Sequence, residues 1–123
     1  MDARLEQYLA SIGASAGALA GWNIQTAKRA GVDVAFVITR WTEIHFVSIV
    51  GNRAMSRRNI AEFVAPLLEK YGYATTRVPI AETDHRLREA LGFQHTWSDD
   101  YYSYWAITEL PYQRKGTTPC PSL

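Results

Sequence analysis

Two side chains that exchange protons lie two residues apart in a stretch with the composition of a β-strand. Glu43 and His45 belong to TEIHFVSIV, which is rich in β-branched and aromatic residues. Alternate residues of a strand point to the same face, so the two side chains would share one face. Glutamate and histidine both serve as general bases, which makes the pair a candidate proton acceptor. The alternative is a charge at a sheet edge beside a hydrogen-bonded surface histidine.

A cluster of arginines forms a second group with chemical potential. Arg53, Arg57 and Arg58 surround Ser56 immediately before a helical apolar pattern. Positive charge at the start of a helix opposes the helix dipole, so the cluster indicates a negatively charged partner. That partner is either a phosphate group, held by charge-assisted hydrogen bonds, or an acidic protein surface. Ser56 would offer its amide to the anion or act only as the N-cap.

The segment WSDDYYSYW contains more tyrosine and tryptophan than a small sheet buries, and these residue types anchor protein interfaces. A second candidate contact is the tail RKGTTPCPSL, which contains Cys120 and lacks core-forming residues. Such a tail is ordered most readily by docking on a neighbouring chain. We therefore expect a homo-oligomer or an assembly with other proteins, with contacts from residues 116–123 and from Trp97, Tyr101, Tyr102, Tyr104 and Trp105.

Several function classes are excluded or disfavoured. The histidines at 45, 85 and 95 have no metal-ligand spacing, and a single cysteine forms neither an internal disulfide nor a thiolate zinc site. No metal is expected. With 13 basic and 12 acidic residues, the net charge of +1 gives no general attraction to nucleic acid or to an anionic membrane. The arginine cluster also lacks interleaved aromatic residues, so nucleic acid is the least favoured partner.

Length and composition predict one domain over residues 1–110, followed by a tail over 111–123. The chain has 123 residues, of which 47% are hydrophobic, and chains of about 100–150 residues usually support one core. The N-terminal MDARLEQYLASIG is charged where a signal peptide would be apolar, and no segment approaches about 18 uncharged apolar residues. We expect a soluble protein in a reducing interior.

The elements that must position these residues follow from apolar spacing. A helix is predicted over residues 2–12, whereas residues 13–31 read equally as a loop or a closely packed helix. VDVAFVITR and TEIHFVSIV predict a hairpin, or two successive antiparallel strands. The clearest helical pattern runs from Ile60 to Tyr71, stops at Gly72, and continues past Pro66, which would bend or tighten the helix.

The second half of the chain predicts a crossover and a closing hairpin. ATTRVPI reads as a strand that runs parallel to the one before the long helix, because a full helix separates them. A short helix over residues 84–91 stops at Gly92, and FQHTW and YYSYWAITE pair around the turn SDD. The predicted fold is α/β (α+β), a central mixed sheet with one right-handed β-α-β crossover.

This order of elements, with the Leu-Gly-Phe corner at residues 91–93, resembles the C-terminal half of the GNAT superfamily of acetyl-CoA-dependent acyltransferases over roughly residues 32–109. The resemblance implies that the strand after the long helix splays away to admit the pantetheine arm of the coenzyme. It also implies a base at Glu43 or His45. Residues that would hold the coenzyme are Val50, Arg53, Ser56, Arg57 and Arg58.

The sequence departs from the family pattern at two places. The phosphate loop has small residues that let backbone amides approach the pyrophosphate, but here the stretch is RAMSRR, with Ser56 and Arg58 at those positions. The tyrosine that often protonates the departing thiolate, four residues before the glycine, is replaced by Arg88. Arginine does not give up a proton near neutral pH, so Tyr101, Tyr102 or Tyr104 would have to substitute.

Two functions follow from the resemblance. The chain is similar in size to small GNAT-like virion and assembly proteins of short-tailed phages, which implies a non-catalytic binding or assembly module in host cytoplasm or virion, with no cofactor. The alternative is an N-acyltransferase that uses acetyl-CoA, with the arginines on the pyrophosphate and Glu43 or His45 as base. Of the two, the sequence favours the assembly module, because the aromatic hairpin and the Pro/Thr/Ser-rich tail both suggest contacts with another chain.

Overall fold

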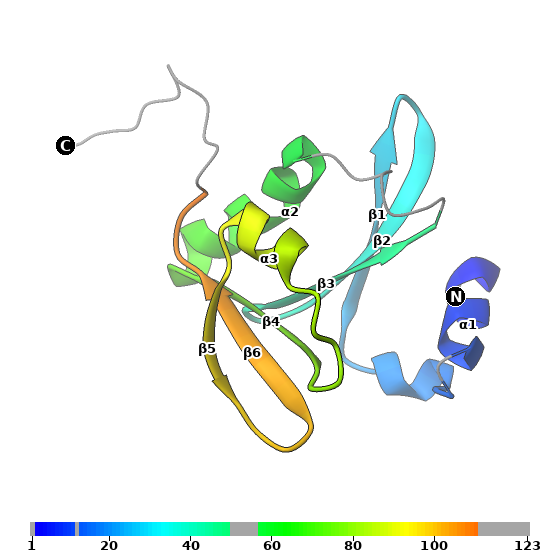
Figure 1. The fold of residues 1–123 in the computed structure, drawn as a ribbon. Helices are drawn as coiled ribbons and strands as arrows, with labels where there is room; N and C mark the ends of the chain where they lie inside the picture. The colour runs from blue at the N-terminus through cyan, green and yellow to red at the C-terminus, as the bar shows by residue number, and fades with distance from the viewer. Residues whose placement is uncertain (1, 12, 50–56, 111–123) are drawn as a thin grey trace.

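A computed structural model describes residues 2–11, 13–49 and 57–110 of the chain (Figure 1). The described part has a six-stranded sheet, and its mixture of parallel and antiparallel strands with helices confirms the predicted fold class. The sheet order is β1-β2-β3-β4-β6-β5. In chain order the elements are α1 (Ala3–Ser11), the 3-10 helix η1 (Ala16–Leu19), β1 (Asn23–Arg29), β2 (Val32–Arg40), β3 (Glu43–Ser48), α2 (Arg57–Tyr71), β4 (Ala74–Pro79), α3 (Arg86–Leu91), β5 (Gln94–Ser98) and β6 (Tyr102–Ile107).

The sheet is made of two antiparallel three-stranded ribbons. β1, β2 and β3 form the first, and β4, β6 and β5 form the second. The predicted β2–β3 hairpin and the closing β5–β6 hairpin are both confirmed. The segment over residues 13–31, which the sequence left undecided, contains a short 3-10 helix and an edge strand.

The ribbons meet where β3 and β4 run parallel, with α2 between them in the chain, as predicted. The helix continues through Pro66 and is followed by Gly72, whose φ of 85° lies in the left-handed region. Glycine adopts this conformation without a Cβ clash, which allows the chain to leave the helix and enter β4 within three residues. The predicted N-cap, Ser56, lies outside the described residues.

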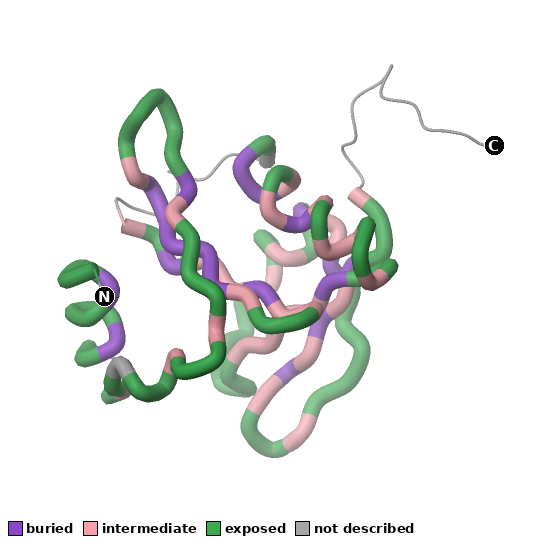
Figure 2. The backbone as a smooth tube through the Cα atoms, turned by 180° about the vertical axis from the view of Figure 1, so that it is seen from behind, coloured by how far each residue is buried: buried purple, intermediate pink, exposed green. Residues whose placement is uncertain are grey.

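The helices cover the sheet unequally on its two faces. Phe36 and Ile38 on β2 pack with Leu5 and Leu9 of α1, whereas the alternating Val37 packs in the larger core with α2 and α3. Figure 2 shows buried residues on the central strands and on α1 and α2, whereas β5 is exposed along its whole length. α1 and η1 therefore cover one face of the first ribbon, and α2 and α3 cover the opposite face of the sheet.

The Leu-Gly-Phe corner closes α3 and starts β5. Gly92 has a φ of 101°, and its N–H is directed at the carbonyl oxygens of Arg88 and Glu89. Phe93 is then buried in the core with Leu91. The corner thus ends a six-residue helix and aims two apolar side chains inward, because a left-handed residue reverses the direction of the backbone.

No helix in the described residues is long and apolar enough to cross a membrane. The longest of them, α2, has 15 residues and includes acidic and basic side chains as well as a proline.

Candidate functional site

The two ribbons separate immediately after the point at which they meet. The Thr75 N–H donates to the Thr42 carbonyl oxygen at 2.7 Å, and Glu43 and Thr75 form the single register pair between β3 and β4 in the described chain. Beyond this pair, β3 follows β2 and β4 follows β6. The parallel strands therefore diverge toward their carboxyl ends (Figure 1).

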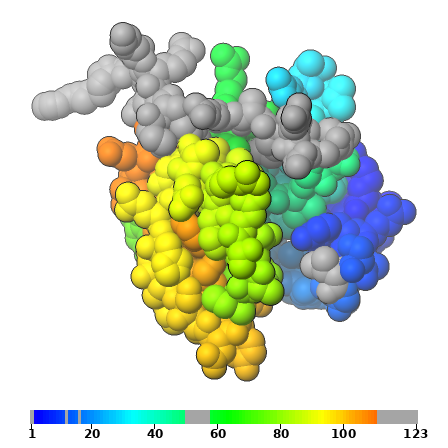
Figure 3. All heavy atoms as spheres, viewed as in Figure 1, coloured from blue at the N-terminus to red at the C-terminus, as the bar shows by residue number. Residues whose placement is uncertain are grey.

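A cleft of about 800 Å³ occupies the gap and reaches both faces of the sheet. One side is lined by residues on the face that carries α1, and the other by residues on the face that carries α2 and α3. Figure 3 shows the yellow-green α3 region at the centre of the view and the blue N-terminal region to its right. An opening through the sheet would accept one ligand from each face. Its walls include His45, Val47 and Arg77 on the first face and Phe46, Val78 and Phe93 on the second.

Backbone amide groups face this gap. The N–H and C=O of one strand residue point to the same edge, and the direction alternates along the strand. Because the Thr42 carbonyl and the Thr75 N–H point across the junction, the same alternation directs the backbone groups of Phe46 and Arg77 into the gap. These groups offer donors and acceptors to an extended ligand that contains amides.

The predicted pair, Glu43 and His45, lies at the narrow end of the cleft. His45 Nε2 is 2.6 Å from Glu43 Oε2, and Arg77 Nε is 3.1 Å from the same oxygen. The hydrogen bond from His45, with the nearby charges of Arg77 and Arg40, holds the pKa of Glu43 below its ordinary value of 4.5. An ionised carboxylate only accepts hydrogen bonds, so Nε2 carries the proton. In neutral His45 the lone pair is therefore on Nδ1.

Trp22 extends the site on the face that carries α1. Its ring lies 5.7 Å from the His45 ring, and the Arg40 guanidinium carbon lies 4.2 Å from the centre of the indole. Sequence reasoning missed Trp22, because it lies in the undecided segment, and it missed Arg77. Parallel pairing of β3 and β4 in the observed register puts Arg77 on the face of Glu43, and the sequence predicted the parallel pair but not its register.

Arg88, at the position where the resemblance expects a proton-donating tyrosine, lines the opposite side of the cleft. Its Nη2 donates to the Asp84 carbonyl oxygen at 2.8 Å and lies 2.8 Å from His85 Nδ1. Its Nε is buried without a hydrogen-bond partner among the described residues. Arg88 therefore provides positive charge at the cleft and no transferable proton.

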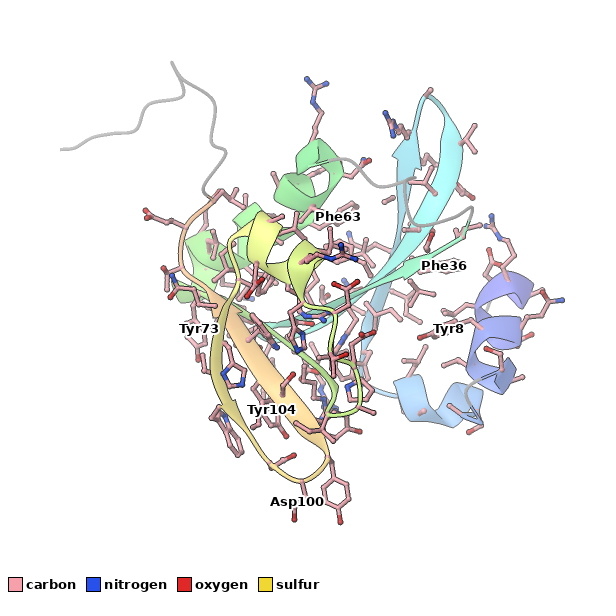
Figure 4. All side chains as sticks on the ribbon, viewed as in Figure 1. Tyr8, Phe36, Phe63, Tyr73, Asp100 and Tyr104 are labelled. Carbon is pink, nitrogen blue, oxygen red and sulfur yellow. The ribbon has the colours of Figure 1, made fainter. Side chains whose placement is uncertain are left out.

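The aromatic hairpin has an outer and an inner face. Trp97 stacks on Tyr104 with ring centres 4.5 Å apart, while Trp97 and Tyr101 are 55% and 74% exposed. Figure 4 shows Tyr104 on this hairpin, with Asp100 at its tip. Tyr102 is half-buried, lies beneath the Arg77 guanidinium and lines the cleft. The proposed interface role of Trp105 is wrong, because this residue is 4% exposed and packs in the core.

Of the tyrosines that would replace a catalytic acid, Tyr104 is poorly suited. Its hydroxyl donates to Asp99 Oδ2 at 2.8 Å, and this hydrogen bond raises the pKa of Tyr104. Raising a phenol pKa makes it a weaker acid at neutral pH. Tyr101 lies at the exposed hairpin turn, which leaves Tyr102 as the tyrosine of the three that lines the cleft.

Part of the predicted site lies outside the described residues. This applies to Val50, Arg53, Ser56 and Cys120, and to the side chain of Arg57. Arg58 is described, and it is exposed on the first turn of α2. The proposed pyrophosphate contact of these residues therefore stays a prediction.

Comparison of the chain with protein-family models gives no match, and comparison with curated protein sequences gives no match either.

Proposed function

We propose that the chain is an N-acyltransferase that moves an acyl group from a thioester such as acetyl-CoA to an amine. The observation that carries the proposal is the divergence of the parallel strands β3 and β4 around a cleft that reaches both faces of the sheet. The GNAT resemblance implies a splayed pair at this place in the chain. A two-sided cleft suits a reaction between two substrates, because each enters from its own face and they meet at the gap.

The gap suits the pantetheine arm of coenzyme A. That arm is a narrow chain with two amide groups, and the backbone groups of Phe46 and Arg77 face the space that it would occupy. Hydrogen bonds to these groups would fix the arm along the strand edge in the manner of an added strand. The thioester would then lie near the narrow end, where His45 lines the cleft.

In the reaction, the amine nitrogen attacks the thioester carbonyl carbon and the C–S bond breaks. The proton lost by the nitrogen passes through water to Nδ1 of His45, and Glu43 stabilises the resulting imidazolium. The thiolate leaves with the electron pair of the C–S bond and takes a proton from solvent. Arg88 lowers the energy of the thiolate by its charge and replaces a proton donor in that role.

Binding of acetyl-CoA tests this function directly. We expect micromolar binding to the full chain by isothermal titration calorimetry, and a loss of at least about tenfold in affinity for Thr76→Phe. Thr76 is half-buried on β4 and lines the cleft, so a larger ring would narrow the gap. The control is Thr96→Phe on exposed β5, which should bind as the unaltered chain does. Absence of acetyl-CoA binding to the unaltered chain rejects the proposal.

The exposed hairpin supports a second function, an assembly module of the kind that the resemblance to phage virion proteins implies. Trp97 and Tyr101 are the aromatic residues that carry it. We expect the full chain to sediment as a multimer at micromolar concentration and the Trp97→Ser, Tyr101→Ser variant to sediment as a monomer. Tyr73→Ser, which changes an exposed tyrosine elsewhere, is the control. A monomeric unaltered chain contradicts this function.

A further inference from the structure

The charge of the cleft wall is predominantly positive. Among the described residues that line it, the side chains with a full charge at neutral pH are Arg40, Arg77, Arg88 and Glu82. Three cations against one anion form an environment that favours a negatively charged ligand group. The pyrophosphate of a coenzyme is assigned by resemblance to residues at the start of α2, so this charge calls for a second anionic group.

The three arginines differ in what already neutralises them. Arg77 forms an ion pair with Glu43, and Arg88 bonds to the Asp84 carbonyl oxygen and approaches His85. Arg40 forms no ion pair with any described residue; its guanidinium lies over the Trp22 ring. Stacking on an indole orients the planar guanidinium while its donors stay available for a carboxylate.

Arg40 and the proposed base share one neighbour. The Trp22 indole lies 4.2 Å from the Arg40 guanidinium carbon and 5.7 Å from the His45 ring. Arg40 and Glu43 are also register partners across the β2–β3 hairpin. One small molecule lying on Trp22 would therefore reach a cation with one group and the base with another.

The part of the cleft wall that α1 and η1 supply is largely apolar. α1 and η1 supply Leu9 and Leu19, and the ring of Tyr8 adds an aromatic surface at the edge of the same cleft. Figure 4 shows Tyr8 on α1 and Phe36 on the sheet that α1 covers. Apolar side chains of this kind accept an apolar ligand body and favour it by removing its surface from water.

We propose that the acyl acceptor is a hydrophobic α-amino acid, bound on the face that carries α1. Its carboxylate pairs with Arg40, its amine approaches Nδ1 of His45, and its side chain lies against Leu9, Leu19 and Tyr8. An α-amino acid fits because its amine and its carboxylate are attached to one carbon. Arg40 and His45 both lie beside the Trp22 indole, so one such molecule would reach both of them. This inference rests on the proposed acyltransferase function.

The test measures transfer from acetyl-CoA to L-phenylalanine, L-phenylalaninamide and phenylethylamine. The amide has the same body and amine without the negative charge, and phenylethylamine lacks the whole carboxyl group. We expect kcat/KM for phenylalanine to exceed that for the amide at least tenfold, which corresponds to about 1.4 kcal/mol, because only the acid forms a hydrogen-bonded ion pair with Arg40. Equal or better use of the amide overturns the inference.

Variants test whether the preference for a carboxylate depends on Arg40 or on the positive charge of the protein in general. Arg40→Gln should reduce the ratio of kcat/KM for acid over amide at least tenfold, and Arg40→Lys, which keeps the charge without the planar stacked guanidinium, should retain only part of it. Arg86→Gln is the control, since Arg86 is exposed on α3, pairs with Asp84 and does not line the cleft. An unchanged ratio in Arg40→Gln, with the fold intact by circular dichroism, overturns the role of Arg40.

Equilibrium binding of acetyl-CoA, together with the transfer assays, distinguishes failure of the acyltransferase function from failure of the proposed acceptor class. If acetyl-CoA binds and phenylethylamine is acylated while phenylalanine is not, the acceptor class is wrong and the acyltransferase stands. If acetyl-CoA does not bind and no amine is acylated, both the function and the acceptor class are rejected.

Discussion

We expect that replacing His45 with glutamine lowers kcat for the proposed acyl transfer by about 10² to 10⁴-fold, the range expected on removal of a positioned general base. His45 bonds to Glu43 through Nε2 and lines the cleft, so its Nδ1 is the nitrogen that could accept the proton of the amine in the proposed reaction. Glutamine is similar in size and polarity and does not accept a proton near neutral pH. Single-turnover rates with acetyl-CoA and saturating amine provide the measurement.

The matched control for this variant is His95→Gln. His95 lies on exposed β5, bonds to Ser98 and does not line the cleft between β3 and β4, so its replacement should leave the rate within about twofold. Acetyl-CoA affinity should be retained in both variants. A His45→Gln enzyme with normal affinity and normal rate would show that the proton leaves by another route.

Replacing Phe93 with alanine lowers the free energy of unfolding by about 3–5 kcal/mol. Phe93 is 4% exposed and packs in the core cluster that joins α2 and α3 to the sheet. Truncation removes most of a large side chain, and the surrounding backbone does not collapse fully into the space. Urea unfolding followed by circular dichroism provides the free energy, and a domain of this size has little reserve against such a loss.

Leu87→Ala is the comparison for this prediction. Leu87 lies on the neighbouring helix α3 but is exposed, so its truncation should change the free energy of unfolding by less than about 0.5 kcal/mol. Similar losses for both variants would mean that the Leu-Gly-Phe corner does not anchor the core, and that Phe93 is solvated in solution.

The sequence predicted those elements in which apolar residues repeat at regular spacing because one face of the element is buried. α2 was evident because its apolar residues repeat at helical spacing and pack on one face of the sheet. β1 was not, because six of its seven residues are exposed or half-exposed and only Ala27 is buried. An edge strand held mainly by backbone hydrogen bonds to β2 leaves no alternation in the sequence to detect.

The part of the site that depends on one strand was predictable from the sequence, and the part that depends on the pairing of several strands was not. Alternation placed Glu43 and His45 on one face, and they bond to each other. The cleft depends on where β3 and β4 stop pairing, which their other partners, β2 and β6, determine from distant parts of the chain. Trp105 shows an overlooked local signal. Alternate residues of β6 point inward, and these are Ser103, Trp105 and Ile107. The predicted interface was based on the number of aromatic residues in the hairpin and did not consider which face of the strand each one occupies.

The junction of the two ribbons consists of one register pair, Glu43 with Thr75, supported by contact between the Thr42 and Thr75 hydroxyl groups at 3.1 Å. Every other ladder in the described sheet lies within one ribbon or the other. The backbones of the two ribbons are thus joined to each other only at this pair of threonines within the described sheet. A rotation of one ribbon against the other at this corner would change the width of the cleft mouth and leave the backbone pairing within each ribbon intact, and the strain would fall on the side-chain core that α2 shares with both ribbons.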